Sequence, residues 1–113
     1  MHEMSLAEGV VRIAEEAAQR ESARRIRSVR IEIGRLAPVE SRALAFCLDA
    51  ASRGTLAQGA AFLLVDVPGS GWCTGCAREV PMTTSFDRCP ECGGGPLRIT
   101  AGTEMRVRDI EIE

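Results

Sequence analysis

The chain has 113 residues, a mass of 12.2 kDa and 45% hydrophobic residues, a size that supports one modest hydrophobic core and excludes a large multidomain enzyme. Its 14 basic and 16 acidic residues give a net charge of -2 and a pI near 5.5, whereas nucleic-acid-binding domains are usually basic. We therefore expect a folded chain that binds neither DNA nor RNA.

The first predicted element is a helix from Ser5 to about Arg20. Apolar or small residues recur at helical spacing within it, at Leu6, Val10, Ile13 and Ala17, with Ala7, Val11, Ala14 and Ala18 beside them. Ser5 and Glu8 fit a capping box, in which the hydroxyl and the carboxylate each accept a hydrogen bond from a backbone N–H of the first turn. The pattern predicts that Ser5 caps the helix.

A strand, a second helix and another strand are predicted next. The strand covers Val29 to Ile33, where apolar and charged residues alternate, and Gly34 ends it. Pro38 suits the first turn of a helix and Gly54 its end. Between them an apolar stripe recurs at helical spacing, at Leu44, Cys47, Leu48 and Ala51. The next strand covers about Ala60 to Val67, and the order strand, helix, strand suggests a right-handed crossover between parallel strands.

The last predicted strand runs from Met105 to Ile112 and returns to the first sheet. Its apolar frame shifts between Val107 and Ile110, which indicates a bulge. Two glycine-containing junctions, Pro68–Gly71 and Gly102, interrupt the pattern before this strand and are the expected hinges.

These elements predict an α+β fold with one insertion. Residues 1–70 and 103–113 are expected to form a small three-stranded mixed sheet with two helices. The remaining residues, 71–102, contain four cysteines and are expected to form an inserted zinc-binding domain of zinc-ribbon type.

The inserted segment carries a metal-ligand pattern. Cys73 and Cys76 form one C-x2-C pair, and Cys89 and Cys92 form a second pair after residues 77–88. This spacing is typical of two turns that face each other and hold one zinc ion in a tetrahedral cage of thiolates. Because the protein supplies all four ligands, no position is open for a substrate water, and we expect the zinc to be structural.

Three other uses of these cysteines stay open in the sequence. They are reduced or disulfide-paired cysteines without metal, iron in the same sulfur geometry, and a thioredoxin-like redox pair. The redox use is disfavoured because such a pair opens a helix after a strand, whereas this segment is rich in Gly and Pro. The fifth cysteine, Cys47, shares helical spacing with Leu44 and Leu48 and is expected to be a small core residue.

The chain is expected to act in the cytoplasm and not in a membrane. Its longest nearly uncharged run, Gly54 to Leu64, is far short of the ~20 apolar residues that span a bilayer. No basic-then-apolar leader opens the sequence. Five cysteines without such a leader suit a compartment that keeps thiols reduced.

The first residues form a second candidate metal site. The amine of Met1, the deprotonated backbone nitrogen of His2 and the His2 imidazole can close fused chelate rings around one ion, a nitrogen-rich set that suits Ni(II) or Cu(II) better than Zn(II). Glu3 could supply another donor. Glu40 is a further candidate, with the alternative that it is an acid in the first turn of a helix. A lone histidine such as His2 is otherwise usually structural or solvated.

Five segments together resemble the HypA/HybF family of hydrogenase nickel-incorporation proteins. They are the opening Met1–Ser5, the strand Val29–Ile33 with Gly34, the pairs Cys73–Cys76 and Cys89–Cys92, and the closing Gly102–Arg106. The resemblance implies a metallochaperone that delivers nickel to the large subunit of a [NiFe] hydrogenase together with the GTPase HypB. In some organisms such a protein also feeds urease maturation.

The same resemblance implies which residues hold which metal. It implies that nickel binds at His2, with the Met1 amine and Glu3 beside it. Family members often place an acid near Glu40. Zinc falls on the four paired cysteines, Cys73, Cys76, Cys89 and Cys92. Some members place histidines beside these cysteines, and this chain does not. A nickel-responsive or pH-responsive change carried by such histidines is therefore in doubt here.

Two other functions compete with a nickel chaperone. The first is a zinc-ribbon adaptor or regulator in which His2 has no role. The second is an enzyme, which the sequence disfavours because its only histidine is residue 2 and no glycine-rich phosphate loop is present. We expect no catalytic activity.

Overall fold

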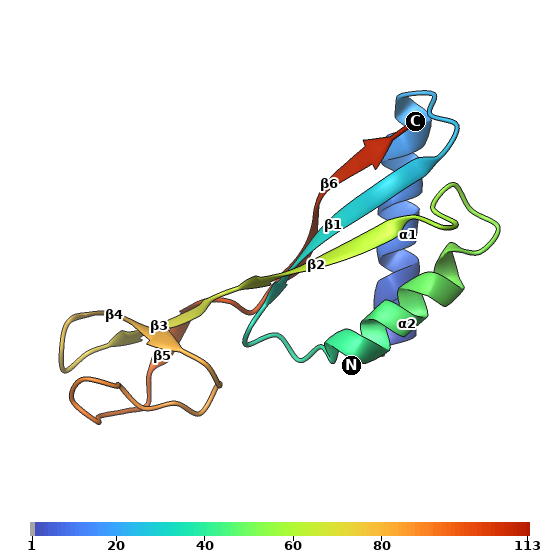
Figure 1. Cartoon of the computed structure of the whole chain (residues 1–113). Coiled ribbons are helices and arrows are strands. Elements are labelled where there is room, and N and C mark those ends of the chain that lie inside the picture. The colour runs from blue at the N-terminus through green and yellow to red at the C-terminus, as the bar shows by residue number, and fades with distance from the viewer. Residues whose placement is uncertain (1) are drawn as a thin grey trace. The chain divides into compact units, whose positions relative to one another are not determined.

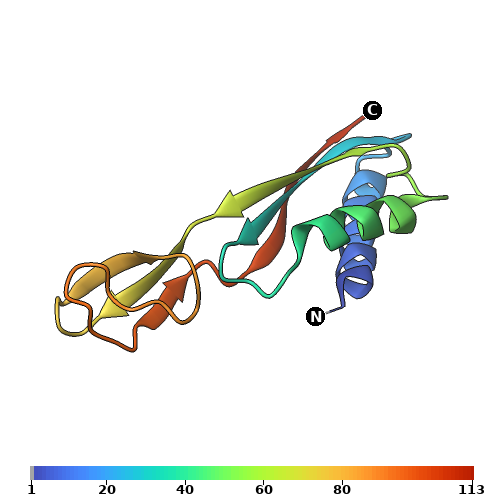
Figure 2. The same cartoon turned by 60° about the horizontal axis from the view of Figure 1, so that its bottom comes forward.

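The structure is a computed structural model that describes residues 2–113. Its elements in chain order are α1 (Glu3–Arg20), β1 (Ile26–Gly34), α2 (Ser41–Ser52), β2 (Ala61–Val67), β3 (Gly69–Cys73), β4 (Arg78–Met82), β5 (Arg98–Ala101) and β6 (Met105–Ile112). The strands form two three-stranded sheets with the orders β2-β1-β6 and β4-β3-β5 (Figure 1). In the first sheet β1 and β2 run in the same direction and β6 runs in the opposite direction (Figure 2). The predicted mixed three-stranded sheet with two helices is confirmed.

The chain divides into two compact units. The helical unit comprises residues up to Glu32, Val39–Val65 and Arg106–Glu113, and the cysteine unit comprises Ile33–Pro38 and Asp66–Met105. The division falls inside β1, β2 and β6, whereas the domain bounds predicted from the sequence lie at residues 70–71 and 102–103. Neither helix among residues 2–113 is long and apolar enough to cross a bilayer.

Helix α1 begins earlier than predicted. It starts at Glu3, and His2 precedes it in an extended conformation, with no side-chain capping bond. The His2 carbonyl accepts the Leu6 N–H at 3.2 Å, and an acid in the first turn complements the helix dipole. The predicted cap at Ser5 is therefore wrong, because the local signature lies inside a helix that has already begun. The face that α1 buries is mostly small: Ala7, Val10, Val11, Ala14 and Ala18.

Strand β1 supplies the centre of the core. Ile26, Val29 and Ile31 are fully buried, and the predicted alternation from Val29 to Ile33 is confirmed. Both helices lie on one side of the sheet β2-β1-β6 (Figures 1 and 2). The side chains that β1 buries therefore pack beneath the helices, and Leu44 and Leu48 of α2 are fully buried as well.

The predicted start of α2 is wrong, and its predicted end is confirmed. Pro38 precedes the helix, which begins at Ser41, because Glu40 caps it with a carboxylate oxygen 2.6 Å from the Ala43 N–H. Gly54 follows the helix with a φ of 77°, a conformation that favours glycine. Cys47 is only partly buried, so it borders the core and does not lie within it.

Polar side chains of β1 and β6 pair with one another. The pairs are Glu32–Arg106, Arg30–Asp109 and Ser28–Glu111. Along β6 the partners of β1 change from residues 106 and 108 to residues 109 and 111. A bulge between Val107 and Ile110, as predicted, would produce this change of partners.

The ion pair between Glu32 and Arg106 is expected to stabilise the fold less at acid pH. The Arg106 guanidinium donates to Glu32 at 2.7 Å and holds the pKa of that carboxyl below its ordinary value of 4.5. A lowered folded-state pKa stabilises the protein above about pH 4.5, and this contribution is lost as pH falls through the lowered value. We expect the free energy of unfolding, followed by helical circular dichroism in urea, to fall less steeply below pH 5 in Glu32→Gln than in the parent. Glu16→Gln removes an exposed charge from α1 and should leave the slope unchanged; equal slopes in all three proteins would contradict the prediction.

Three glycines bring the backbone segments of the cysteine unit into close contact. Gly34 donates its N–H to Glu104 at 2.7 Å, and Leu36 donates its N–H to Gly102 at 2.8 Å. A Cβ on Gly34 would overlap the Gly102 carbonyl, and one on Gly102 would lie 2.6 Å from the Gly69 Cα. Gly69 and Gly71, which belong to a junction expected to be a hinge, lie in β3 instead. These backbone segments can approach one another so closely only because the glycines have no side chains.

We expect Gly102→Ala to destabilise the cysteine unit more than Gly93→Ala. Both residues have positive φ, 96° and 72°, so both substitutions carry a conformational cost of about 1–2 kcal/mol. A Cβ at Gly93 meets nothing within 4 Å, whereas one at Gly102 meets backbone atoms, which adds about 1–3 kcal/mol. Urea unfolding followed by the fluorescence of Trp72, the only tryptophan, measures the difference. Equal midpoints for the two variants would show that the backbone moves apart at no cost.

Candidate metal centre

The first cysteine pair lies on a β-hairpin. Strands β3 and β4 pair antiparallel with Cys73 opposite Arg78, so residues 74–77 form the turn. Cys73 ends β3 and Cys76 lies within this turn, where Ala77 has a φ of 53°. The hairpin therefore presents both sulfurs at one end. The sequence did not predict these strands, because the segment is rich in residues that usually mark turns.

The second pair lies on a tight loop. The Cys89 N–H donates to the Gly94 carbonyl at 2.8 Å, and the Gly93 N–H donates to the Cys89 carbonyl at 2.9 Å. The Gly94 N–H also reaches the Cys92 sulfur at 3.4 Å. These bonds hold the loop so that Cys89 and Cys92 face the hairpin. An ion pair between Arg78 and Glu91 joins the hairpin to the loop.

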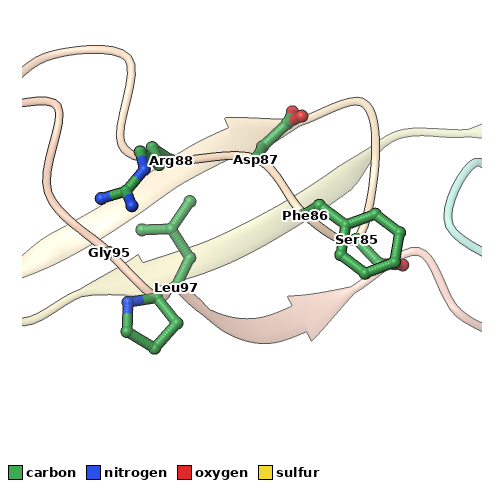
Figure 3. A pocket seen from close by; sticks show the side chains of 7 residues that line it. Ser85, Phe86, Asp87, Arg88, Gly95 and Leu97 are labelled. Carbon is green, nitrogen blue, oxygen red and sulfur yellow. The ribbon is translucent and has the colours of Figure 1, made fainter.

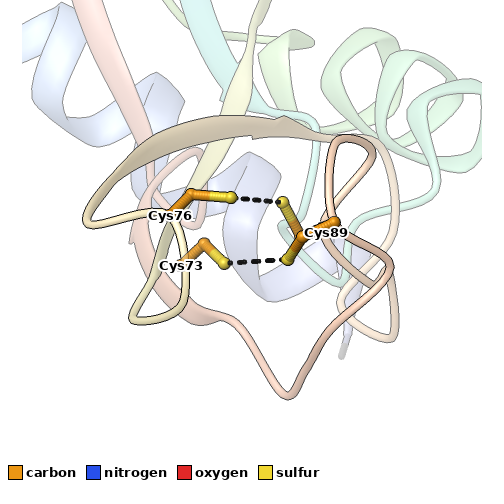
Figure 4. A group of neighbouring side chains, drawn as sticks. Cys73, Cys76 and Cys89 are labelled. Carbon is orange, nitrogen blue, oxygen red and sulfur yellow. Dashed lines mark hydrogen bonds between the residues drawn. The ribbon is translucent and has the colours of Figure 1, made fainter.

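The four sulfur atoms fit one tetrahedral metal ion. They all lie within 4.8 Å of one another, and the Cys73–Cys92 and Cys76–Cys89 sulfur distances are 3.6 and 3.9 Å (Figure 4). A tetrahedron with Zn–S bonds of about 2.3 Å has edges of about 3.8 Å, whereas a disulfide would bring two sulfurs to about 2 Å. The geometry therefore matches the predicted sulfur cage and not a pair of disulfides.

Few apolar side chains surround the four cysteines. Cys73, Val80 and Cys89 are buried, and Cys76 and Leu97 pack against them. Cys92 is exposed, so one side of the site faces solvent. A core of this size contributes little to stability without a bound metal.

Hydrogen bonds in the cysteine cluster shift the pKa values of two of the thiols in opposite directions. Hydrogen bonding to the sulfurs of Cys92 and then Cys89 raises the pKa of the Cys76 thiol to about 12. The backbone N–H of Cys92 lowers the pKa of Cys89. Several thiolates at this separation repel one another unless a cation lies between them. Four soft donors without an open position suit a structural Zn(II) ion.

The predicted amino-terminal site is partly described. Met1 lies outside the described residues. His2 is exposed at the start of α1, and Glu3 lies in the first helical turn. The Glu40 N–H donates to a Glu3 carboxylate oxygen at 3.2 Å and lowers the pKa of that carboxyl. The structure thus brings Glu40 beside Glu3.

The side chain of Glu40 has a structural role at the start of α2. Its carboxylate accepts the Ala43 N–H and caps α2. This agrees with the alternative that Glu40 is an acid at a helix start. The two roles are compatible, because the N–H that contacts Glu3 and the carboxylate that caps the helix are different groups of one residue.

One organised loop of the cysteine unit was not predicted. The Asp87 carboxylate accepts hydrogen bonds from the backbone N–H groups of Thr83 and Thr84, at 2.7 and 3.3 Å, and from both threonine hydroxyls. The Thr84 hydroxyl, followed by these N–H groups, lowers the pKa of Asp87 to about 2. The pattern Thr83-Thr84 with Asp87 three residues on was the signal in the sequence.

Comparisons with known proteins agree along the whole chain. The family described as "Hydrogenase/urease nickel incorporation, metallochaperone, hypA" matches residues 1–112. The hydrogenase maturation factor HypA of Dechloromonas aromatica is 55% identical and that of Albidiferax ferrireducens 49%, each over 100% of both chains. The solution structure of the Ni metallochaperone HypA from Helicobacter pylori has a TM-score of 0.70 at 24% identity and covers 99% of this chain and 97% of its own. That structural likeness supports the fold.

Proposed function

The chain belongs to the HypA family of nickel-incorporation metallochaperones, and we propose that it binds Ni(II) at its amino terminus and delivers it to the large subunit of a [NiFe] hydrogenase. The family is one of metal-delivery proteins and not of enzymes. The observation that carries the proposal is the arrangement of His2 and Glu3 at the exposed start of α1, beside Glu40.

The nickel ligands are assigned to Met1, His2 and Glu3. The Met1 amine, the His2 backbone nitrogen and the His2 imidazole supply the nitrogen set that Ni(II) favours. His2 makes no side-chain capping bond to α1, so its imidazole can bind and release an ion without disturbing the helix. Glu40 fixes the Glu3 carboxylate through its N–H and is a further candidate ligand.

The four cysteines are assigned a structural Zn(II) ion. When bound, zinc supplies a fixed cross-link between the β3–β4 hairpin and the loop of Cys89 and Cys92, with no chemistry of its own. Support comes from sulfur distances that bracket the tetrahedral edge. Reduced cysteines of this kind suit the cytoplasm, which is where we assign the protein.

The proposed partners follow from the family and from the chain's own chemistry. The sequence holds no glycine-rich phosphate loop, so any nucleotide-driven step belongs to a partner, for which we assign a HypB-type GTPase. The acceptor is the hydrogenase large subunit. A supply of nickel to urease maturation is a second use, since the family description names both enzymes.

A transfer assay with purified components tests the proposal. The chain, with Met1 as its first residue, is loaded with zinc and one Ni(II), then mixed with the GTPase, GTP and a nickel-free large subunit, and nickel in the large subunit is measured. We expect transfer to be abolished in His2→Ala, because the imidazole is a ligand, with zinc content and helical circular dichroism unchanged. Glu8→Gln, one exposed acid further along α1, should transfer normally.

Two results would count against the proposal. Transfer by His2→Ala at the parent's rate would move the nickel site elsewhere. A parent protein that binds no stoichiometric nickel would instead favour the zinc-ribbon adaptor, in which the amino terminus has no role.

A further inference from the structure

An exposed aromatic side chain stands beside a hollow in the cysteine unit. The Phe86 side chain is 93% exposed, the highest value among the large apolar residues of the described chain. The adjacent hollow of about 280 Å³ is lined by residues 85–88 on one side and residues 95–97 on the other (Figure 3). We call this hollow, together with Phe86, the Phe86 groove.

The loop that carries Phe86 is held in place. Asp87 accepts hydrogen bonds from Thr83 and Thr84, and the Phe86 N–H lies 3.3 Å from the Thr84 hydroxyl. The exposed ring is therefore presented by an ordered turn. The backbone that carries the ring therefore loses little conformational freedom when a partner covers it, which lowers the entropic cost of binding. Phe and Arg side chains are both enriched at the centres of protein interfaces.

The groove is lined by two charged side chains, Asp87 and Arg88. The Asp87 carboxylate is engaged by the threonines and, in Figure 3, points away from Arg88 and Leu97. Arg88 takes part in none of the ion pairs found among residues 2–113. Its side chain extends along Gly95, where an added Cβ would lie 3.4 Å from the Arg88 Cγ. The exposed guanidinium is thus positioned beside the hollow, where a carboxylate of a ligand can reach it.

The volume of the hollow selects the kind of ligand. Sites for whole small molecules usually have volumes of about 300–1,000 Å³, and this hollow of about 280 Å³ is smaller and open to solvent. It suits one or two side chains of a protein segment. The lining combines apolar surface from Leu97 and Phe86 with the charge of Arg88, and the Asp87 carboxylate points away from Arg88 and Leu97.

We infer that the Phe86 groove docks an extended acidic segment of a partner protein. An aliphatic side chain of that segment fills the hollow against Phe86 and Leu97, and a neighbouring carboxylate pairs with Arg88. Arginine suits this task because its planar fork binds a carboxylate through two hydrogen bonds. The ligand class is distinct from nickel, and none of the groove residues is a nickel or zinc ligand assigned above.

A displayed library of random dodecapeptides tests this inference. The library is selected against the zinc-loaded full chain and depleted against the double variant Phe86→Ala, Arg88→Gln. We expect the enriched peptides to carry an Asp or Glu within two residues of a Leu, Ile or Val. A synthetic peptide with an enriched sequence should then bind the parent at least tenfold more tightly than it binds either single variant.

Matched controls separate the groove from general stickiness and from misfolding. Phe46, on α2, is 75% exposed, and Phe46→Ala should bind the peptide as the parent does. Zinc content and Trp72 fluorescence should be the same in every variant. Since substitution of an exposed ring leaves the core intact, we expect Phe86→Ala to fold.

Each other outcome overturns the inference. These outcomes are no enrichment, enrichment of basic peptides, equal affinity for the parent and Phe86→Ala, and Phe86-dependent self-association or vesicle binding without peptide binding. The selection contains no nickel, so its failure leaves the nickel-transfer assay untouched. A failed transfer assay likewise leaves the groove in place.

Discussion

We expect Cys89→Ser to release the zinc ion and unfold the cysteine unit, while the helical unit keeps its fold. The buried cluster at the site consists of Cys73, Val80 and Cys89 with two partly buried neighbours, and Met82 is also buried in this unit. Two of the three residues of the cluster are proposed metal ligands, so removing the metal removes most of this small core. Structural zinc contributes about 10–16 kcal/mol of apparent binding free energy in small zinc domains at neutral pH, far more than this cluster could replace.

The chain offers two independent spectroscopic readouts for this prediction. Both helices belong to the helical unit and Trp72 belongs to the cysteine unit. Helical circular dichroism should therefore persist, while Trp72 fluorescence changes to that of an exposed indole. The matched control is Cys47→Ser, because Cys47 is the one cysteine outside the cluster, and this variant should keep one zinc per chain. Retention of one zinc and of the parent's fluorescence by Cys89→Ser would overturn the structural role.

Local sequence signals made the main elements predictable. Strand β6 has the predicted bounds, Met105–Ile112, and β2 begins one residue later than predicted, at Ala61. Both strands contain strand-forming residues, although only β1 alternates regularly. Gly54 was identified as following the end of α2 for a similar local reason, since its φ of 77° favours glycine.

The wrong or missing predictions concern features that depend on contacts between residues far apart in the sequence. Helix α1 begins at Glu3, whose carboxylate accepts the Glu40 N–H from a segment far along the chain. A local capping signature at Ser5 contains no trace of that contact. Likewise β3, β4 and β5 were not predicted, because their sequences lack alternation. Their pairing is instead a matter of tertiary structure, in which the antiparallel register of β3 and β4 brings Cys73 and Cys76 to one turn.

The two metal sites were predictable to different degrees. The four cysteines were identified by spacing alone, and the structure brings their sulfurs together. Glu40 was a candidate for the same end of the fold, with a helix-start acid as the alternative; its N–H lies beside Glu3 and its carboxylate caps α2. Ligation of nickel by Met1, His2 and Glu3 stays a prediction, since it depends on a terminal amine, and Met1 lies outside the described residues.

The terminal amine gives the last prediction. Adding Gly-Ser before Met1, with every other residue retained, should weaken Ni(II) binding by at least about 100-fold, beyond the 10–100-fold typical of changes to groups around the ligands. The extension turns the amine into an amide and removes one arm of the fused chelate, while His2 and Glu3 are unchanged. Protons compete with nickel for the same nitrogen atoms, so binding by the parent should also weaken between about pH 8 and about pH 6.

Calorimetry with Ni(II) on the parent, the extended chain and His2→Ala at the two pH values measures these effects. The matched control carries Gly-Ser after Glu113, which lies in the helical unit but outside the proposed site, and should bind nickel as the parent does. Because His2 makes no side-chain capping bond, the fold and the zinc content should be equal in all four proteins. If the amino-terminal extension bound nickel as tightly as the parent, the amine would not be a ligand. His2 would then have to act with side chains alone, and Glu3 and Glu40, which already lie together, would be the residues to replace next.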